Sequence, residues 1–326
     1  MTFPITDDHT GAGSQSIRRA TTGPMSASQP RVVWAGGPQA RDLANSIAAI
    51  EVTKAGSNLA SSCIDSRADL LVLSNRTSLN LCSTAVPHGF SSEATRSIVA
   101  AVGGGPHSLL AGTLTSWLSD ALGVPASAVV GYSDPTELPG AYAVLDQLAE
   151  LLPQLPSRTV EATNPQAMVQ ALPSGTLLVV GAPGGSWFQR RFFGPGARIR
   201  AKASDGTIVV SHSPACVYQF MQPPVGFGPK MWVADALLLS EGTDIHVAER
   251  GKLLGTVRIE ALENARRDLE LHQIMDTEIF LSVDDPIDEA ADLVALHGDG
   301  LVPVVDDQSN LVGCVSSKAL SASRVE

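Results

Sequence analysis

The feature that most constrains the fold of this chain is an alternation of short apolar runs and helical patterns over residues 97–213. Strands that alternate with helices form parallel sheets, because each crossover helix returns the chain to the same edge of the sheet. The pattern predicts an α/β fold with a parallel sheet that helices cover on both faces. Expected strands are 98–102, 128–132, 159–162, 176–180 and 207–210, and expected helices are 107–122, 141–152 and 165–172.

Composition and charge restrict the classes of partner. Apolar residues make up 44% of the chain, which is enough for ordinary cores, and the formal net charge is −11. An acidic chain is a poor match for nucleic acid and for anionic membrane surfaces. No apolar stretch has the length of a membrane span, and acidic Asp7 and Asp8 argue against a secretory signal. We expect a cytoplasmic protein whose scattered cysteines are reduced: Cys63, Cys82, Cys216 and Cys314.

Changes in composition and hydrophobic pattern divide the chain into five parts. Residues 1–30 are rich in Thr, Ser, Gly and Pro and predict a disordered tail. Residues 31–82 predict a partial β-α-β segment that packs on the core, and residues 83–96 predict a connector. Residues 97–213 form the predicted parallel-sheet domain, and residues 214–326 form a C-terminal domain with an internal repeat.

Glycines cluster after the strand predicted at 176–180. Gly181, Gly184 and Gly194 follow the pattern G-x2-G-x9-G, with Pro195 next. Glycine lets the backbone approach a ligand closely. This segment resembles the universal stress protein family, whose nucleotide-binding members continue the pattern with Ser or Thr where this chain has Pro195. The resemblance implies a Rossmann-like domain of universal stress protein type that binds ATP or AMP, with Mg²⁺ expected only as the companion of the nucleotide.

The turn after the first strand of this domain resembles the same family. It runs through Gly103, Gly104 and Gly105 to Ser108 at the start of a helix. Gly103 stands where nucleotide-binding relatives have an Asp near the nucleoside. The backbone of Val130, at the end of the second strand, matches the family position that contacts adenine. Tight strand–helix turns without a ligand would explain the same glycines.

The C-terminal domain contains two copies of one pattern. The segment 220–222 aligns with 274–276, and 253–257 aligns with 311–315 at a slightly larger offset. The run Leu-Val-Pro-Val-Val-Asp-Asp at 301–307, followed by Leu-Val-Gly-Cys-Val-Ser at 311–316, resembles the second strand pair of the CBS domain. The resemblance implies an α/β CBS pair, with copies at about 214–265 and 269–322, that dimerises through its helices.

In ligand-binding CBS pairs, a Thr or Ser and an Asp three residues later hold phosphate and ribose. The second copy keeps Ser316 but has Ala319 at the Asp position. The first copy has Arg258 and Ala261 at the two positions. Arg258 could still meet a phosphate as a forked donor, or it could be a solvent-facing arginine at a helix start.

The sequence offers no positive case for catalysis. None of its seven histidines lies in an H-E-x-x-H or G-x-S-x-G context, and the paired acids at 284–285 and 306–307 are typical of turns. The leading hypothesis is therefore a non-catalytic regulatory or stress-response protein. It would bind an adenine nucleotide, dimerise through the CBS pair and signal to an unidentified protein. The alternatives are a ligand-free scaffold with degenerate sites and, last, a nucleotide hydrolase.

Overall fold

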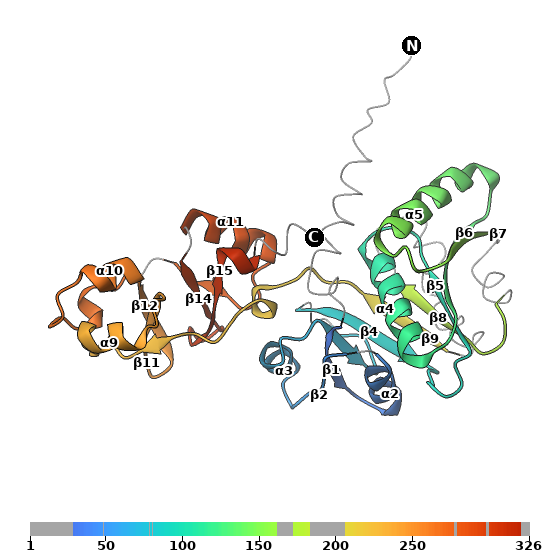
Figure 1. Ribbon diagram of the computed structural model, residues 1–326. Coiled ribbons are helices and arrows are strands. Elements are labelled where there is room, and N and C mark those ends of the chain that lie inside the picture. Colours follow the sequence, from blue (N-terminus) through green and yellow to red (C-terminus); the bar gives the residue numbers. More distant parts are fainter. Residues whose placement is uncertain are drawn as a thin grey trace, which may run out of the picture. The chain divides into compact units, whose positions relative to one another are not determined.

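The computed structural model describes residues 29–320 except 48, 78, 80, 162–171, 183–205, 277–278 and 298–299. The chain divides into two compact units, Met1–Pro214 and Ala215–Glu326 (Figure 1). Within the described ranges, no helix has both the length and the apolar character that a membrane crossing requires.

The first unit is built on one nine-stranded sheet with the order β2-β1-β3-β4-β9-β8-β5-β6-β7. All neighbouring strands are parallel except β4 and β9, which pair antiparallel in the middle of the sheet. The strands are β1 (Arg31–Ala35), β2 (Glu51–Lys54), β3 (Leu70–Leu73), β4 (Ser83–His88), β5 (Ser97–Ala101), β6 (Ala126–Tyr132), β7 (Ser157–Glu161), β8 (Thr176–Gly181) and β9 (Thr207–Ser211).

In the part of this unit that the structure describes, four helices and one short 3₁₀ turn lie between the strands. The longest, α4, has ten buried residues spread round its circumference, as expected for a helix enclosed on several sides. The helices are α2 (Pro38–Ser46), α3 (Leu59–Asp65), α4 (Pro106–Leu122), η1 (Pro135–Glu137) and α5 (Leu138–Leu151).

The sheet consists of two similar halves that meet at the antiparallel pair. In chain order, β1, β2, β3 and β4 occupy the same relative places as β5, β6, β8 and β9. The first strand of each half leads into a glycine N-cap and a proline in the first turn of a helix, Gly37–Pro38 before α2 and Gly105–Pro106 before α4. The first half is thus a shortened counterpart of the second, without an equivalent of β7 among the described strands.

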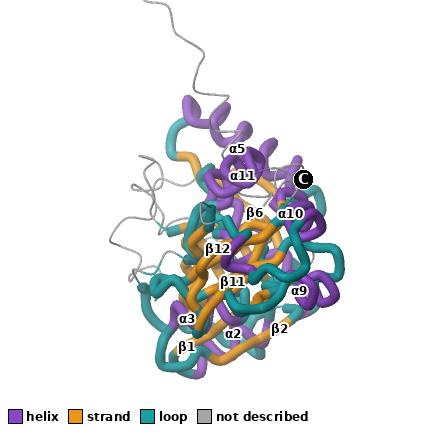
Figure 2. Tube along the Cα trace, turned by 90° about the vertical axis from the view of Figure 1, so that its left-hand side faces the viewer, coloured by secondary structure: helices purple, strands orange, loops and turns teal. Residues whose placement is uncertain are grey.

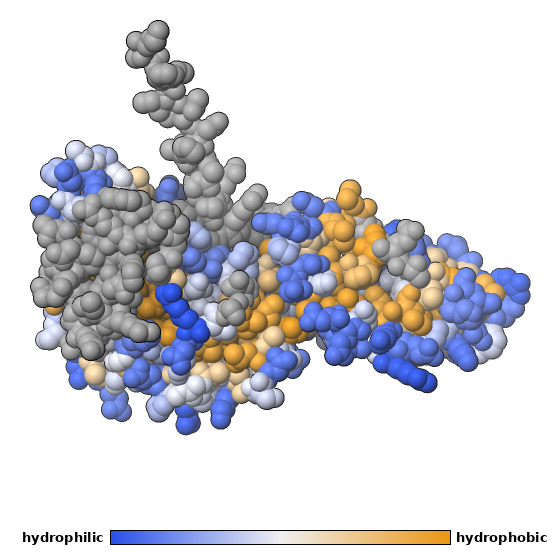
Figure 3. All heavy atoms as spheres, turned by 180° about the vertical axis from the view of Figure 1, so that it is seen from behind, coloured by the Kyte–Doolittle hydropathy of each residue, from blue (hydrophilic) through white to orange (hydrophobic). Residues whose placement is uncertain are grey.

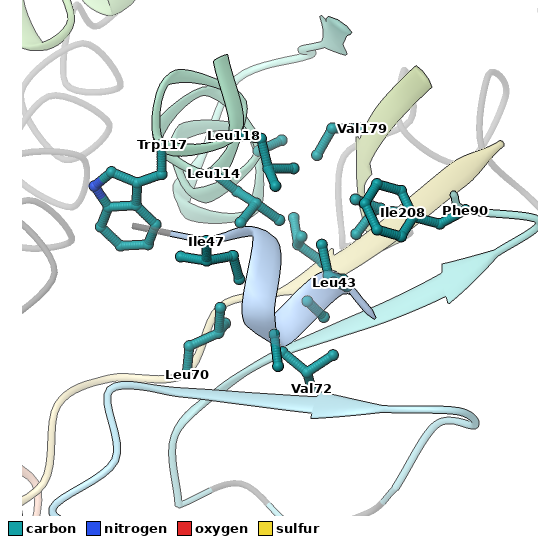
Figure 4. Packing of buried hydrophobic residues seen from close by; sticks show 14 of the residues in the cluster. Leu43, Ile47, Leu70, Val72, Phe90, Leu114, Trp117, Leu118, Val179 and Ile208 are labelled. Atoms are coloured by element: carbon teal, nitrogen blue, oxygen red, sulfur yellow. The ribbon is translucent and has the colours of Figure 1, made fainter. Parts of the chain in front are cut away.

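One hydrophobic core joins the two halves. Leu43 of α2 and Ile47, which directly follows that helix, meet Leu114 and Leu118 of α4 over the sheet (Figure 4). Trp117 is only 8% exposed and completes the contact from α4. The shared core explains why the two halves form a single compact unit.

The structure corrects the prediction for residues 83–96. Residues 83–88 form β4, which lies at the centre of the sheet rather than in a connector. Pro87 makes a strand hard to predict from sequence here, because proline has no N–H for the ladder. Pairing with β3 ends at Ala85, so Pro87 lies beyond that ladder and faces only Ile208 of β9. The segment 31–82 likewise contributes strands to the same sheet.

The second unit contains two copies of one arrangement of short strands and helices. Figure 2 draws strands in orange and helices in purple. In each copy a 3₁₀ turn and a short parallel strand precede a helix and an antiparallel strand pair. The first copy comprises η2 (Val217–Gln219), β10 (Gly226–Phe227), α9 (Val233–Leu239), β11 (Ile245–Glu249), β12 (Lys252–Val257) and α10 (Ile259–Asn264); the second comprises η3 (Leu271–Gln273), β13 (Leu281–Ser282), α11 (Ile287–His297), β14 (Leu301–Val305) and β15 (Leu311–Ser316).

The segment that begins each copy, residues 216–222 in the first and 270–276 in the second, pairs with the other copy. We call these the entry segments. Cys216 forms a backbone β-bridge with Pro286, and Glu270 forms one with Trp232. The second bridge repeats the first, because Glu270 lies 54 positions after Cys216 and Trp232 lies 54 positions before Pro286. Gln222 bridges to Cys314 and Asp276 to Thr256 in the same reciprocal way, as the predicted alignment requires. The second unit therefore has an internal pseudo-twofold symmetry, and neither copy is complete without the other.

One stabilising substitution follows from the geometry of α5. Gly140 lies inside this helix, and nothing within 4 Å would meet a methyl group there. Gly140→Ala should raise the free energy of unfolding by about 0.5–1 kcal/mol, because alanine loses less backbone freedom on folding. Urea unfolding measures the change, and a destabilised variant would contradict the helix at this position.

Candidate functional site

The turn between β5 and α4 has a backbone that only glycine adopts readily. Gly104 and Gly105 have φ values of 85° and 81°, in the left-handed region. Gly105 is the N-cap of α4, no side chain caps the helix, and no acidic residue lies in its first turn. The N-terminus of this 17-residue helix, the positive end of its dipole, therefore lies at the turn. No acidic side chain of the first helical turn offsets that partial positive charge.

Ser108 holds the turn in shape. Its Oγ accepts the Gly103 N–H at 3.0 Å and donates to the Gly104 carbonyl at 3.0 Å. The side chain is 5% exposed. Three of the predicted binding residues are therefore brought together by one hydroxyl, whose first role is to position the backbone.

Gly181, the last residue of β8, lies against the first turn of α4. A methyl group on Gly181 would come within 2.9 Å of His107 Cβ and 3.1 Å of the His107 carbonyl carbon. The structure thus supplies a packing reason for Gly181 in addition to the predicted approach of a ligand. We define the rim as residues Gly103–Ser108 together with Gly181.

His107 connects the rim to the end of β9. Its Nδ1 accepts the backbone N–H of His212 at 2.8 Å, so Nδ1 is the unprotonated ring nitrogen. Burial and then the charge of Arg76 lower the pKa of His107. Burial and then His107 lower the pKa of His212 to about 4. Both histidines are therefore neutral at neutral pH, and the sequence alone had not placed them together.

The rim lies where the order of strands reverses. From β5 the chain first adds β6 and β7 on one side of the sheet and then β8 and β9 on the other. In open α/β sheets, ligands bind outside the carboxyl ends of the strands at this switch point. β5 and β8 are direct neighbours; β8 ends at Gly181, and Gly103 follows the end of β5 by two residues.

A small pocket lies between the rim and α5. Its volume is about 20 Å³, which is room for a water molecule and far less than a nucleotide needs. It is lined by Val102, Gly104, Gly105, Ser108, Leu109, Val144, Gln147, Leu148 and Leu151. A nucleotide would have to lie outside it, along the carboxyl edge of the sheet.

Of the remaining predicted residues of the first unit, the structure describes Val130. Val130 is 2% exposed and belongs to the core between the sheet and α5. Its backbone lies in the parallel ladder opposite Thr159. Gly184, Gly194 and Pro195, like the helix expected at 165–172, lie outside the described residues.

The equivalent turn in the first half is closed by a side chain. Ser74 Oγ accepts the Gly37 N–H at 2.6 Å and occupies the space beside Gly36. Ser74 follows β3, the counterpart of β8. The two halves therefore differ at their turns, and the rim of the second half is the better candidate for an anion.

In the second unit, Arg258 and Ser316 occupy corresponding positions at helix starts. Arg258 is the N-cap of α10 and makes no side-chain cap. Ser316 Oγ accepts the Ala319 N–H at 3.2 Å and caps the last helical turn itself. The Ser316 hydroxyl therefore has a hydrogen-bond partner in its own helical turn. Both residues belong to the second unit, whereas the rim belongs to the first.

Asp244 is a buried carboxylate that sequence reasoning missed. Its two oxygens accept the Ile259 N–H at 2.8 Å and the Leu301 N–H at 2.9 Å. It thus places a negative charge at the start of α10 and joins the first copy to β14 of the second. No local motif could reveal this role, because its partners lie 15 and 57 residues away.

A change at Gly181 tests the packing of the rim. Gly181→Ala should lower the free energy of unfolding of the first unit by about 2 kcal/mol, because the methyl group meets the backbone and Cβ of His107 in α4. Chemical denaturation compares it with Gly140→Ala, where the space is open. Equal stability of Gly181→Ala and the natural chain would show that the rim is looser than described.

A metal centre receives no support from the described ranges. No group of three or more His, Cys, Asp or Glu side chains there is placed to hold a metal ion. The chemistry that the described rim offers is that of backbone N–H groups and a helix N-terminus, which suits an anion.

Comparison with known proteins identifies one domain. Residues 271–325 match the CBS domain model. No curated protein matches the chain.

Several solved CBS pairs are similar to about a third of the chain. A CBS domain pair/ACT domain protein from Thermotoga maritima is 22% identical, with 34% of this chain and 96% of the other covered and a TM-score of 0.31. CBSX2 from Arabidopsis thaliana is 19% identical, with 35% and 96% covered and a TM-score of 0.32. The pair of MJ0100, solved with 5′-methylthioadenosine and S-adenosyl-L-methionine, is 22% identical, with 33% and 94% covered and a TM-score of 0.31. The chain thus carries a CBS domain at residues 271–325.

Proposed function

We propose that this chain is a non-catalytic regulatory protein whose first unit binds an adenine nucleotide at the rim. The observation that carries the proposal is the pair of left-handed glycines, Gly104 and Gly105, before an uncapped 17-residue helix at the switch point of a parallel sheet. Backbone N–H groups at such a helix start attract phosphate. The resemblance to universal stress proteins adds the adenine moiety.

The acidic character of the chain makes a locally built site necessary. With a net charge of −11, the protein repels a polyanion at long range. A site made of backbone N–H groups and a helix dipole attracts phosphate at short range without added cations. The rim has these features, and the histidines beside it are neutral at neutral pH.

The CBS unit supplies assembly in this proposal. Leu238 and Leu239 of α9 are 82% and 56% exposed, and Leu293 and Leu296 of α11 are 40% and 90% exposed. Leu239 and Leu293 are equivalent under the 54-residue offset. The two copies therefore expose apolar side chains on equivalent helices, α9 and α11. Figure 3 shows apolar side chains on one face of this unit. We infer that a second copy of the chain covers these helices.

The second candidate is a ligand-free scaffold, and specific contacts favour it in the CBS unit. The Asp244 carboxylate occupies the start of α10, and the Ser316 hydroxyl is engaged by its own helix. Ala261 and Ala319 replace the carboxylates that would hold ribose. In that case the CBS unit only assembles the protein.

Thermal unfolding with ligand separates the two candidates. The probes are ATP, AMP and cyclic AMP, with the two adenosine compounds bound by MJ0100 added for the CBS unit. At a hundredfold excess over Kd, a ligand adds about 2.7 kcal/mol, which raises Tm by several degrees. The proposal expects a rise with ATP or AMP that is clearly smaller in Gly181→Ala. No rise with any probe would leave the scaffold.

The assembly is tested by one charge on α11. Leu296→Glu should convert a dimer into a 33.9 kDa monomer, because a carboxylate in an apolar interface is left unpaired. Light scattering after gel filtration measures the mass. Tyr142→Glu, at an exposed aromatic residue of α5, is the matched control and should remain dimeric. A natural chain that elutes as a monomer would contradict the assembly.

A further inference from the structure

Two buried cysteines lie side by side in the first unit. Cys63 is the buried residue of α3, and Cys82 directly precedes β4. The register brings them together, because Ser83 pairs with Leu70 and the Cys63 carbonyl accepts the Ala68 N–H at 2.8 Å. The two thiols lie within hydrogen-bond reach of each other, and both are reduced.

The helix that carries Cys63 is held by few interactions. Of the seven residues of α3, Cys63 is the one classed as buried. The helix start depends on the exposed Asn58 side chain, which accepts the N–H groups of Ala60 and Ser61 at 3.0 and 3.2 Å. Segments with so little buried surface open locally at low free-energy cost. Opening of α3 gives small oxidants access to both thiols.

The Cys63 thiol also differs in chemistry from the two cysteines of the second unit. The hydrogen bond from Cys82 lowers the pKa of the Cys63 thiol, against the opposing effect of burial. In the second unit, burial raises the pKa of Cys314, and burial with the charges of Asp284 and Asp285 raises that of Cys216 to about 11. A thiolate is the reactive form of cysteine, so Cys63 is the favoured nucleophile.

We propose that Cys63 and Cys82 form a reversible disulfide when the protein meets a hydroperoxide. The Cys63 thiolate attacks one peroxide oxygen, the O–O bond breaks, and a sulfenic acid forms with release of water. The Cys82 thiol then attacks that sulfur, the S–O bond breaks, and a second water leaves. In sum, two thiols and one H₂O₂ give one disulfide and two H₂O, and a thiol reductant reverses the oxidation.

The disulfide would act on the strand that anchors the end of the first unit. Ser83, next to Cys82, accepts the Ser213 N–H through its Oγ at 3.2 Å. Residue 213 is the last but one of the first unit, which ends at Pro214. Oxidation would tie α3 to this anchor and close a loop over residues 63–82, which restricts local opening.

Peptide mapping of the full chain tests the proposal. After treatment with a small excess of H₂O₂ and blocking of free thiols, trypsin releases Cys63 in peptide 55–67 and Cys82 in peptide 77–96. We expect these two peptides joined, and separated again by dithiothreitol. Cys63→Ser should abolish the linked species and Cys216→Ser should leave it unchanged. Sulfinic acid at Cys63 with both peptides unlinked would overturn the proposal.

A second measurement needs no substitution. Native alkylation of the reduced chain with a maleimide should label Cys63 and Cys82 about tenfold or more faster than Cys216 and Cys314, because local opening of α3 exposes them. Prior peroxide treatment should protect the first two and leave the others unchanged. Equal labelling rates for all four cysteines would contradict the access route, and labelling after peroxide would contradict the disulfide.

Discussion

Gly255→Ala is expected to destabilise the second unit by about 3 kcal/mol. A methyl group at this position would lie 2.5 Å from the Asp276 carbonyl oxygen and 3.2 Å from Met275 Cγ. The Asp276 backbone cannot move without breaking the two hydrogen bonds it forms with Thr256, at 2.7 and 2.8 Å. Overpacking and the loss of both bonds therefore add up.

The matched control for this change is Gly228→Ala. Gly228 lies in the same unit, and nothing within 4 Å would meet the added methyl group. Urea unfolding followed by circular dichroism should shift for Gly255→Ala and remain within about 0.5 kcal/mol for Gly228→Ala. Equal stability of the two variants would show that the copies do not exchange their entry segments as described.

Protonation of His246 is also expected to destabilise the second unit. Its free energy of unfolding should fall by about 3 kcal/mol as the pH is lowered from 6.5 to 4. This side chain is fully buried, its Nδ1 lies 3.2 Å from Thr256 Oγ1, and its Nε2 has no hydrogen-bond partner within the described ranges. Burial lowers its pKa to about 4, against the opposing charge of Asp244. The ordinary value of 6.5 applies to the unfolded chain.

The sign of the effect follows from proton binding. Between pH 4 and 6.5 the unfolded chain binds a proton at His246 that the folded chain does not, so stability rises with pH across this window. Above pH 6.5 the contribution is complete. Urea unfolding at several pH values should show this slope, and His246→Gln should flatten it. An unchanged slope in His246→Gln would assign the acid sensitivity to other groups.

The parallel strands of the second half were predictable from sequence because each is a continuous apolar run bounded by turn residues. β5 and β8 are examples, buried almost throughout in the structure. Runs of this kind are typical of strands covered on both faces. The glycine turn between β5 and α4 was predictable for the same reason, since it follows the run directly.

The missed elements lack such local signals. β2 is a polar edge strand, Glu-Val-Thr-Lys, with little buried surface. β4 contains Pro87, and its place in the middle of the sheet depends on pairing with β9, more than a hundred residues later. Edge strands and strands defined by distant partners carry weak local preferences.

Contacts at the candidate site depend on tertiary structure in the same way. The bond between His107 and His212 joins residues 105 positions apart, and Ser74 closes the first turn from a different strand. The two copies in the second unit were easier to align, because a repeat compares the chain with itself. Their contacts at Gln222–Cys314 and Asp276–Thr256 have the reciprocal form that the alignment implies.

Isothermal titration of ATP and AMP into the full chain tests the central claim, binding at the rim, most directly. One nucleotide should bind per chain, with the same affinity in Gly140→Ala. In Gly181→Ala the affinity should fall at least about tenfold, equal to about 1.4 kcal/mol. No heat with either nucleotide, or equal affinity in Gly181→Ala and the natural chain, would contradict a nucleotide site at the rim.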